Sequence, residues 1–552
     1  MAKKKSRNNF MLHGAILGVS SILVRVIGLI YRIPLINILG EKGNAYYSIA
    51  FDVYSILLLL SSYSLPLAVS KMVSARNAKN QFKNLKRVFF MAISFSILVG
   101  LIAFCITFFG ADFFAKINDC PQCVIALRVL SPALVILSVL GVLRGFFQGF
   151  GTMIPTAVSN ILEQIVNAVV SLVAASPLFK QGQLISESQY GFTNIPEAYG
   201  AAGGTLGTVM GALFAMLFMI FLFMTFRKRL NTLARNDRGH RKESFGRILK
   251  ILVATVVPVI LSTLIYNIGA LLDTVVFRNI MGTLDYAKDS IDVMTGMYSG
   301  NYRILINVPV ALASALASSL IPSIVRSRTL GNRGEVINKI ESAIKVTMVV
   351  AMPCAVGIGV LGKPIVNMLF SHSVDPDKVA LMYAIGCISV VFYSLSTITN
   401  SILQGIDKMN VPVLHSAISL LIHLAFLAGM LFILRIDIFS VVIADLIFSL
   451  LMCILNQRSL KRFLNFRQDL LNTYFKPAIC SVLMGIIVLV VNKLLIKVIH
   501  SNTVCVLLCI IIAFVVYFLA LVFFRTVGED ELAMIPGGGR VTRLLRKIRL
   551  IR

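Results

Sequence analysis

Long apolar runs recur along almost the whole chain, and they constrain its fold more than any other feature. A helix needs about 20 apolar residues to cross the roughly 30 Å hydrocarbon core of a bilayer. Helices satisfy their own backbone hydrogen bonds in lipid, and single runs of this length exclude a β-barrel. By this rule the sequence contains fourteen spans, at residues 11–39, 45–70, 88–109, 122–148, 153–177, 200–226, 247–281, 295–325, 343–370, 379–404, 410–434, 438–457, 475–498 and 502–525.

The composition excludes a globular cytosolic enzyme. The 552 residues are 57% hydrophobic and only 14% charged, with a mean hydropathy of +0.87, whereas soluble chains carry about 25% charged residues. The net charge of +28 comes from short basic clusters between apolar runs. Such clusters are topology signals, and they differ from the continuous basic stripe of a nucleic-acid-binding protein. We therefore expect an all-α integral membrane protein without a nucleic-acid partner.

The basic clusters also predict the orientation of the chain. The amino-terminal Met-Ala-Lys-Lys-Lys precedes an apolar run that is too long for a signal peptide and offers no cleavage site. If this end lies in the cytoplasm, 37 of the 52 Lys and Arg residues fall in inside segments and nine in outside segments. Cytoplasmic loops are enriched in Lys and Arg. The alternation therefore predicts a multi-pass protein with both termini in the cytoplasm.

The two halves of the chain resemble each other at one constant spacing. Gln148-Gly-Phe-Gly-Thr-Met153 recurs as Gln404-Gly-Ile-Asp-Lys-Met409, 256 residues later, and Pro66 matches Pro322 at the same spacing. Each repeat contains six spans, so the two repeats run in the same direction. Parallel repeats of this kind place a substrate site near the bilayer midplane, between two lobes that rock against each other. This is the architecture of a transporter.

The repeat predicts the domain organisation. We expect an N-terminal lobe at 1–226, a basic cytoplasmic linker at 227–246, a C-terminal lobe at 247–460, two additional spans at 461–526 and a basic tail at 527–552. In the tail, apolar residues share one face of a helix surrounded by Arg and Lys, a pattern typical of helices that lie on anionic membrane lipids.

A polar stripe in the first span predicts the substrate site. Gly14, Gly18, Ser21, Arg25, Gly28 and Arg32 follow one face of a helix at spacings of three and four residues. A stripe with two arginines cannot face lipid, so it faces a partner helix or a wet cavity. Arginine binds phosphate in bidentate fashion and keeps its charge at low dielectric. With Arg303 in the eighth span, these arginines suit an anionic, phosphorylated headgroup.

Other polar residues within the spans leave two interpretations open. Asp52, Glu163 and Asn307 are candidate substrate-binding residues beside the arginines; alternatively, the arginines pair with Asp52, Glu163 and Asp273 as structural contacts. Asp273 and Asn400 are candidates for a coupling Na⁺ or proton, with a plain salt bridge of Asp273 as the alternative. Arg144 and Arg278 lie near span ends, where structural or interfacial roles are expected.

No motif for covalent catalysis is present, and no cofactor or metal is expected. The pair Cys120-Pro-Gln-Cys123 lies in a predicted outside loop. A zinc site needs a second pair of ligands, so the alternatives are an external disulfide and incidental thiols.

Several segments resemble one known family. Arg144-Gly-Phe-Phe-Gln-Gly149, Met153-Ile-Pro-Thr156 and Glu163-Gln164 resemble the pattern of Gram-positive MurJ/SpoVB-type proteins of the MOP (multidrug/oligosaccharidyl-lipid/polysaccharide) exporter superfamily. The serine-rich segment 394–400 and the segment 308–322 are similar to it as well. The resemblance covers all fourteen spans.

The resemblance implies a flippase in the bacterial plasma membrane. Its cargo would be an undecaprenyl-diphosphate-linked sugar, lipid II in the MurJ case, and cell-wall synthesis enzymes would be its partners. The family's first-span arginines map onto Arg25 and Arg32, and its eighth-span arginine maps onto Arg303. The chain departs from Gram-negative relatives at three positions, where an arginine, a carboxylate and a loop aspartate are replaced by Leu57, by Ile306 or Asn307, and by Asn44.

Three alternatives compete with a lipid II flippase. One is a sporulation-specific flippase of another lipid-linked sugar. A second is a MATE-like cation or drug antiporter, which should have an acidic and aromatic cavity. The third is a membrane glycosyltransferase or a scaffold for envelope assembly, for which the acidic loop with Asp285, Asp289 and Asp292 is the catalytic candidate.

Overall fold

The computed structural model is built from α-helices joined by short loops. It describes residues 2–188, 194–237, 242–329, 331–371, 373–466, 468–524 and 526, and these contain no β-strand. Among them, eleven helices are long and apolar enough to cross a membrane. The prediction of an all-α membrane protein is confirmed, while the count of fourteen spans stays a prediction. The predicted amphipathic tail at 527–552 lies outside the described residues.

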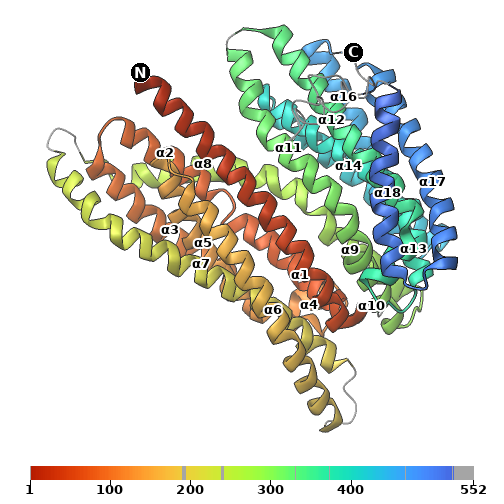
Figure 1. The fold of residues 1–552 in the computed structure, drawn as a ribbon. Helices are drawn as coiled ribbons and strands as arrows, with labels where there is room; N and C mark the ends of the chain where they lie inside the picture. Colours follow the sequence, from red (N-terminus) through yellow and green to blue (C-terminus); the bar gives the residue numbers. More distant parts are fainter. Residues whose placement is uncertain are drawn as a thin grey trace. The chain divides into compact units, whose positions relative to one another are not determined.

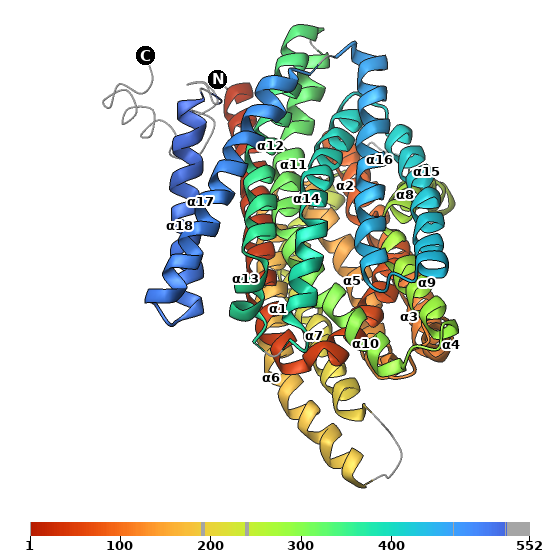
Figure 2. The same ribbon diagram turned by 90° about the vertical axis from the view of Figure 1, so that its right-hand side faces the viewer.

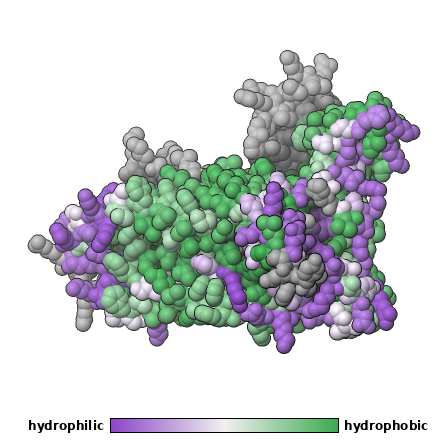
Figure 3. All heavy atoms as spheres, turned by 90° about the horizontal axis from the view of Figure 1, so that it is seen from below, coloured by the Kyte–Doolittle hydropathy of each residue, from purple (hydrophilic) through white to green (hydrophobic). Residues whose placement is uncertain are grey.

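The surface carries the apolar side chains that a membrane protein presents to lipid. Figure 3 shows a broad area of hydrophobic side chains on one face, with hydrophilic side chains gathered toward its two ends. Large apolar side chains are exposed on several helices of both units, among them Phe109, Phe514 and Phe523, with 74 to 78% of their surface exposed. Soluble monomeric proteins rarely expose contiguous apolar patches larger than a few hundred Å². The exposed apolar side chains of this protein are instead suited to contact with lipid.

The chain forms two compact units, Met1–Gly300 and Asn301–Arg552. Their boundary lies inside a π-helical segment, Met297–Tyr302, because the short helices that follow the predicted linker pack on the first unit. The packing thus divides the chain after Gly300, whereas the sequence repeat divides it at residues 227–246. The domain boundaries drawn from the repeat stay a prediction.

The first unit contains ten helices among its described residues (Figure 1). They are α1 (Ala2–Ser61), α2 (Leu65–Ala78), α3 (Phe82–Phe109), α4 (Ala111–Ile117), α5 (Cys123–Gly149), α6 (Ile154–Ser188), α7 (Ile195–Asn236), α8 (Phe245–Asn267), α9 (Gly269–Thr283) and α10 (Lys288–Gly296). The long helices α6 and α7 pack side by side, and α7 also packs on α5 and α1.

A sharp break at Gly40 turns α1 back on itself. Gly40 has φ 65° and ψ −178°, a backbone conformation that is essentially restricted to glycine. In an unbroken helix Arg32 and Tyr47 would lie about 22 Å apart, but the guanidinium of Arg32 lies 4.4 Å from the centroid of the Tyr47 ring. The two predicted spans at 11–39 and 45–70 are therefore adjacent antiparallel segments separated by this glycine.

The Arg-Gly-Phe-Phe-Gln-Gly segment at the end of α5 forms part of the core of the first unit. Phe146 is fully buried and contacts Phe89, Phe223 and Phe226 in edge-on arrangements. A Cβ at Gly145 would lie 2.6 Å from the Pro66 carbonyl oxygen of α2. The glycine thus permits close packing of α5 on α2, and the phenylalanines fill the space beside it.

The second unit contains eight α-helices among its described residues (Figure 2). Its elements are α11 (Arg303–Thr329), α12 (Arg333–Val360), α13 (Gly362–Leu369), α14 (Pro376–Gly405), α15 (Asn410–Gly429), a π-helical segment (Met430–Leu434), α16 (Phe439–Leu464), a second π-helical segment (Leu471–Phe475), α17 (Lys476–Val498) and α18 (Asn502–Phe523). Helices α5 and α14 end at glycines 256 residues apart, and α6 and α15 begin 256 residues apart. The repeat in sequence is therefore a repeat in helix boundaries.

Candidate functional site

The predicted polar stripe lies on the amino-terminal segment of α1 and faces α6 in part. A Cβ at Gly28 would lie 3.2 Å from the side-chain nitrogen of Gln164, and α1 packs on α6. Asn167, one turn further along α6, donates to the Tyr31 hydroxyl at 3.4 Å. Arg25 is exposed. Gly28 thus lies beside a partner helix, while the prediction that the stripe faces either a partner helix or a wet cavity stays a prediction.

Arg32 is held by an aromatic ring. Its guanidinium stacks on Tyr47, which is fully buried, and a cation–π contact of this kind contributes roughly 0.5–2 kcal/mol. The Nε of Arg32 is buried and has no hydrogen-bond partner among the described residues, and the same holds for the hydroxyls of Tyr47 and Tyr54. Within the described part of the chain, Arg32 is therefore a positioned cation whose Nε donor is not paired with a carboxylate.

Glu163 is paired with a different arginine from the two in α1. Arg144 Nη2 lies 2.7 Å from Glu163 Oε2, and Arg144 Nε donates to the Ser159 hydroxyl at 2.8 Å. This ion pair joins α5 to α6. Glu163 was a candidate substrate-binding residue, and its role as such stays untested. The structural role expected for Arg144 is consistent with this pair.

The carboxy-terminal segment of α1 is hydrogen-bonded to the end of α10 and to the π-helical segment that follows it. The Asn44 amide donates to the Gly296 carbonyl and to the Ser299 hydroxyl, both at 3.2 Å, and the Ser48 hydroxyl donates to that of Ser299 at 2.8 Å. A Cβ at Gly296 or Gly300 would collide with α1, at 1.9 Å from the Glu41 carbonyl or 2.2 Å from the Asn44 amide. Asn44, compared above with a loop aspartate of relatives, is thus a buried helical residue.

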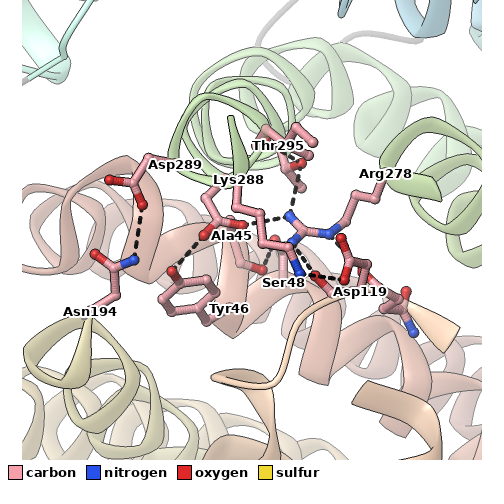
Figure 4. Close-up of polar contacts among 12 residues, drawn as sticks. Ala45, Tyr46, Ser48, Asp119, Asn194, Arg278, Lys288, Asp289 and Thr295 are labelled. Carbon is pink, nitrogen blue, oxygen red and sulfur yellow. Dashed lines mark hydrogen bonds and ion pairs between the residues drawn. The ribbon is translucent and has the colours of Figure 1, made fainter. Parts of the chain in front are cut away.

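A buried ion pair lies beside these contacts between α1 and α10 (Figure 4). Arg278 Nη1 is 2.8 Å from Asp292 Oδ1, with only 2% and 4% of the two side chains exposed. The Tyr46 hydroxyl donates to Asp292 Oδ2 at 2.6 Å. Arg278 also donates to the carbonyls of Asn118 and Asp119, at 2.7 and 2.8 Å. The pair therefore joins α1, α9, α10 and the loop before α5.

Two of the three loop aspartates have structural partners. Asp292 pairs with Arg278, Asp289 pairs with Lys42 at 2.8 Å, and Asp285 occupies a left-handed turn with φ 60°. General acid–base chemistry needs carboxylates that converge on one reacting group. Asp289 and Asp292 instead pair with two different cations, which argues against these two residues as the catalytic pair of a transferase.

Asp289 is the basis of a pH prediction. Hydrogen bonds from Lys42 and then from Asn194 lower the pKa of Asp289 below its ordinary value, so its ion pair stabilises the fold above that ordinary pKa and is lost as the pH falls through the lowered one. We expect wild type to melt at a higher temperature than Asp289→Asn at pH 5–7, and the difference to shrink as the pH falls below about 4 and to vanish below the lowered pKa. Because 63% of Asp289 is exposed, the difference is small and decreases with salt. A difference independent of pH would contradict this assignment.

The remaining predicted residues are distributed over both units. Asp52 is half-buried on α1, and Asp273 is 5% exposed on α9 in the first unit. In the second unit, Arg303 is half-buried at the start of α11, directly after the π-helical segment, and Asn307 is exposed one turn later. Roles of these residues in substrate binding and ion coupling stay predictions.

Asn400 belongs to a buried hydrogen-bond network that joins α14, α15 and α16. The amide of Asn456, which is fully buried, donates to Asn400 Oδ1 at 2.8 Å and to the Thr399 hydroxyl at 3.0 Å. Asn456 Oδ1 lies 2.7 Å from His415 Nδ1, and the Ser459 hydroxyl lies 3.2 Å from His415 Nε2. The side chain of Asn456, on α16, therefore hydrogen-bonds to residues of both α14 and α15.

This network predicts a stability loss for Asn456→Ala. The substitution removes the partners of His415 Nδ1 and of Asn400 Oδ1 inside the helix bundle, and interhelical hydrogen bonds in membranes contribute about 0.6–1.7 kcal/mol each. We expect the free energy of unfolding to fall by roughly 1–3 kcal/mol, measured by thermal unfolding in detergent. For Ser459→Ala, which removes only the contact with His415 Nε2, the free energy of unfolding should fall by less. Equal losses in the two variants would contradict the central role of Asn456.

The chain's own sequence contained signals for some of these contacts. Gly296 and Gly300 form a small-xxx-small pair of the kind that allows close helix packing, and this spacing is a sequence signal for the contact with α1. The pairing of Arg278 with Asp292 has no periodic signal, because the two residues lie on separate helices. Asn456 is a polar residue in an apolar run, which is itself a reason to expect an interior partner.

Two curated proteins of Bacillus subtilis (strain 168) are similar to this chain. The lipid II flippase MurJ is 27% identical over 442 residues, which cover 77% of each chain. The stage V sporulation protein B is 22% identical over 434 residues, which cover 78% of each chain. The resemblance to MurJ/SpoVB-type proteins that the sequence motifs predicted is thereby confirmed.

Solved structures show the same fold, and a family model identifies the chain. A lipid II flippase MurJ in an inward closed conformation superposes with a TM-score of 0.64 at 15% identity, covering 93% of this chain and 99% of that one. An inward-facing MATE transporter of the MOP superfamily superposes with a TM-score of 0.61 at 16% identity, covering 81% and 99%. Residues 13–328 match the family model described as "polysaccharide biosynthesis protein". Because this match spans more than half of the sequence, the chain belongs to the polysaccharide biosynthesis protein family.

Proposed function

We propose that this chain is a flippase that moves a polyprenyl-diphosphate-linked sugar, lipid II in the first place, from the inner to the outer leaflet of the bacterial plasma membrane. The observation that carries the proposal is Arg32, a guanidinium positioned on Tyr47 within a membrane helix, whose buried Nε has no acceptor in the described part of the chain. The similarity to a flippase named for lipid II supports the same cargo.

The chemistry of the cargo explains why arginine is needed. Burying a diphosphate without partners costs many kcal/mol, so an unassisted headgroup does not cross hydrocarbon at a useful rate. Guanidinium groups form strong bidentate hydrogen bonds with phosphate. In the proposal Arg25, Arg32 and Arg303 attract the diphosphate during alternating access, while the polyprenyl tail stays in lipid. Asp52, Glu163 and Asn307 would contact the remainder of the headgroup.

The energy source is part of the proposal. An inside-negative potential contributes about 2.3 kcal/mol per charge per 100 mV, which favours the return of an empty cationic site toward the cytoplasm. Asp273 and Asn400 are the candidates for a coupling Na⁺ or proton. Abolishing the membrane potential should slow flipping; unchanged flipping would contradict this part.

A MATE-like antiporter is the second candidate, because solved MATE structures share the fold. A pathway for organic cations should attract cations, whereas α1 supplies Arg25 and Arg32. This difference in charge favours an anionic cargo.

The direct test is rescue of a bacterium depleted of its own lipid II flippase. Wild type at a verified membrane level should restore growth and prevent the accumulation of lipid II in the inner leaflet. Failure of well-expressed wild type would contradict lipid II as cargo. Rescue of a sporulation mutant instead would favour another lipid-linked sugar, and drug resistance without either rescue would favour the antiporter. Purification of the flippase with cell-wall synthesis enzymes would test the proposed partners.

A further inference from the structure

Two cysteines meet in the tight turn that opens α5. Cys123 is the first residue of α5, and its backbone N–H donates to the Cys120 carbonyl at 3.2 Å. Both side chains are fully buried in the core of the first unit. The turn therefore holds two buried thiols three residues apart, on residues that a backbone hydrogen bond joins.

Residues of α9 and α10 contact the segment that precedes this turn in the chain. The Asn279 amide donates to the Ile117 carbonyl at 2.7 Å, and Arg278 donates to the next two carbonyls, at 2.7 and 2.8 Å. Lys288 Nζ lies 2.9 Å from the carboxylate of Asp119 (Figure 4). Asp119 itself has a left-handed φ of 45°. These contacts fix the position of Cys120 relative to the start of α5.

A metal does not explain the pair. Structural zinc needs four ligands, and the described residues contain no group of three or more His, Cys, Asp or Glu side chains that could hold a metal ion. Two thiols held in one turn can also be oxidised to a disulfide. The distribution of Lys and Arg predicts that this turn lies outside the cytoplasm, where disulfides form and persist.

We propose that Cys120 and Cys123 are a modification site, a dithiol that is converted to a disulfide by exchange with an external disulfide donor such as a thiol–disulfide oxidoreductase. One cysteine thiolate attacks a donor sulfur, so that an S–S bond breaks and one donor thiol leaves after protonation. The second thiolate then attacks the mixed disulfide and releases the second donor thiol. Two cysteine thiols are oxidised, one donor disulfide is reduced, and two protons pass to the leaving sulfurs.

The disulfide would add to the contacts by which α9 and α10 hold this turn in place. Because both sulfurs are buried in the folded chain, exchange takes place while segment 117–123 is open, during folding or transient opening. Once formed, the bond limits the conformations that this segment can reach when it opens. The turn that Arg278 holds would then stay closed more often.

Trapping the thiols in cells tests the proposal. Cells that make the full-length protein are quenched in acid, free thiols are blocked with N-ethylmaleimide under denaturing conditions, and disulfides are reduced and tagged with a maleimide polymer. We expect two tags on wild type and on the control Cys505→Ser/Cys509→Ser, and none on Cys120→Ser/Cys123→Ser. A wild type without tags, or tags that survive in Cys120→Ser/Cys123→Ser, would overturn the proposal.

A second measurement does not depend on variants that fold. Trypsin should release residues 117–128, between Lys116 and Arg128, with both cysteines and no others. From wild type blocked as above but not reduced, this peptide should be found two hydrogen atoms lighter than the dithiol and free of N-ethylmaleimide. Recovery of the peptide with two maleimide groups would refute the proposal. Neither measurement requires flippase activity, so the result is independent of the proposed function.

Discussion

Replacing Arg278 by methionine should remove most folded protein from the membrane. The substitution leaves the Asp292 carboxylate, only 4% exposed, without its cation, and breaking a buried pair in this way costs about 3–5 kcal/mol. It also leaves the Asn118 and Asp119 carbonyls without their donors. A loss of this size is a large fraction of the 5–15 kcal/mol that stabilises a typical protein. Thermal unfolding in detergent, followed by size-exclusion chromatography, measures it.

Arg128→Met is the matched control for this prediction. Arg128 also pairs with an aspartate at 2.8 Å, but 46% of Arg128 and 69% of Asp112 are exposed, so its loss should cost at most about 1 kcal/mol. The double variant Arg278→Met/Asp292→Leu removes both charges and should recover part of the loss, since an apolar pair can replace a buried ion pair. Recovery should be incomplete because the two carbonyls still lack donors. Equal melting temperatures for Arg278→Met and Arg128→Met would refute the structural role of the buried pair.

The parts of the fold that the sequence could predict are those that follow local periodicity. Long apolar runs require helices in a membrane, and the 256-residue repeat correctly matched the end of α5 to that of α14. The unit boundary inside Met297–Tyr302 could not be found in this way. It depends on α8 to α10 packing on the first unit, and packing between distant segments leaves no periodic trace.

The candidate site shows the same limit. A stripe at spacings of three and four residues placed Arg25 and Arg32 on one face of a helix, and Gly28 does contact α6 on that side. The partner of Glu163 could not be deduced, because several arginines lie at a suitable depth and only the structure selects Arg144. Nor does spacing indicate that Gly40 folds α1 back and brings Tyr47 under Arg32. Which charged residues pair with each other can be determined only from the tertiary fold.

Replacing Arg32 by alanine should abolish rescue of flippase-depleted cells at a membrane level equal to wild type. The hydrogen bonds of a charged donor to an anion contribute about 1.5–3 kcal/mol each, so we expect translocation to slow by roughly 10- to 100-fold. Arg32→Lys keeps the charge but loses the planar fork that binds phosphate and stacks on Tyr47, and it should retain intermediate activity. Rates measured in vesicles with a labelled lipid-linked sugar separate this effect from protein amount.

Two comparisons decide whether the defect reflects handling of the anion or loss of packing. Tyr47→Phe keeps the ring beneath Arg32 and removes a buried hydroxyl that has no hydrogen-bond partner in the described residues, so the variant should translocate close to the wild-type rate. Tyr47→Leu removes the ring that positions the guanidinium and should slow transport, with a smaller effect than Arg32→Ala because the charge remains. Arg128→Ala removes an exposed arginine from α5 and should leave transport unchanged. If Arg32→Ala transports as fast as Arg128→Ala while both proteins are folded, Arg32 does not contact the diphosphate, and the cationic site must lie elsewhere.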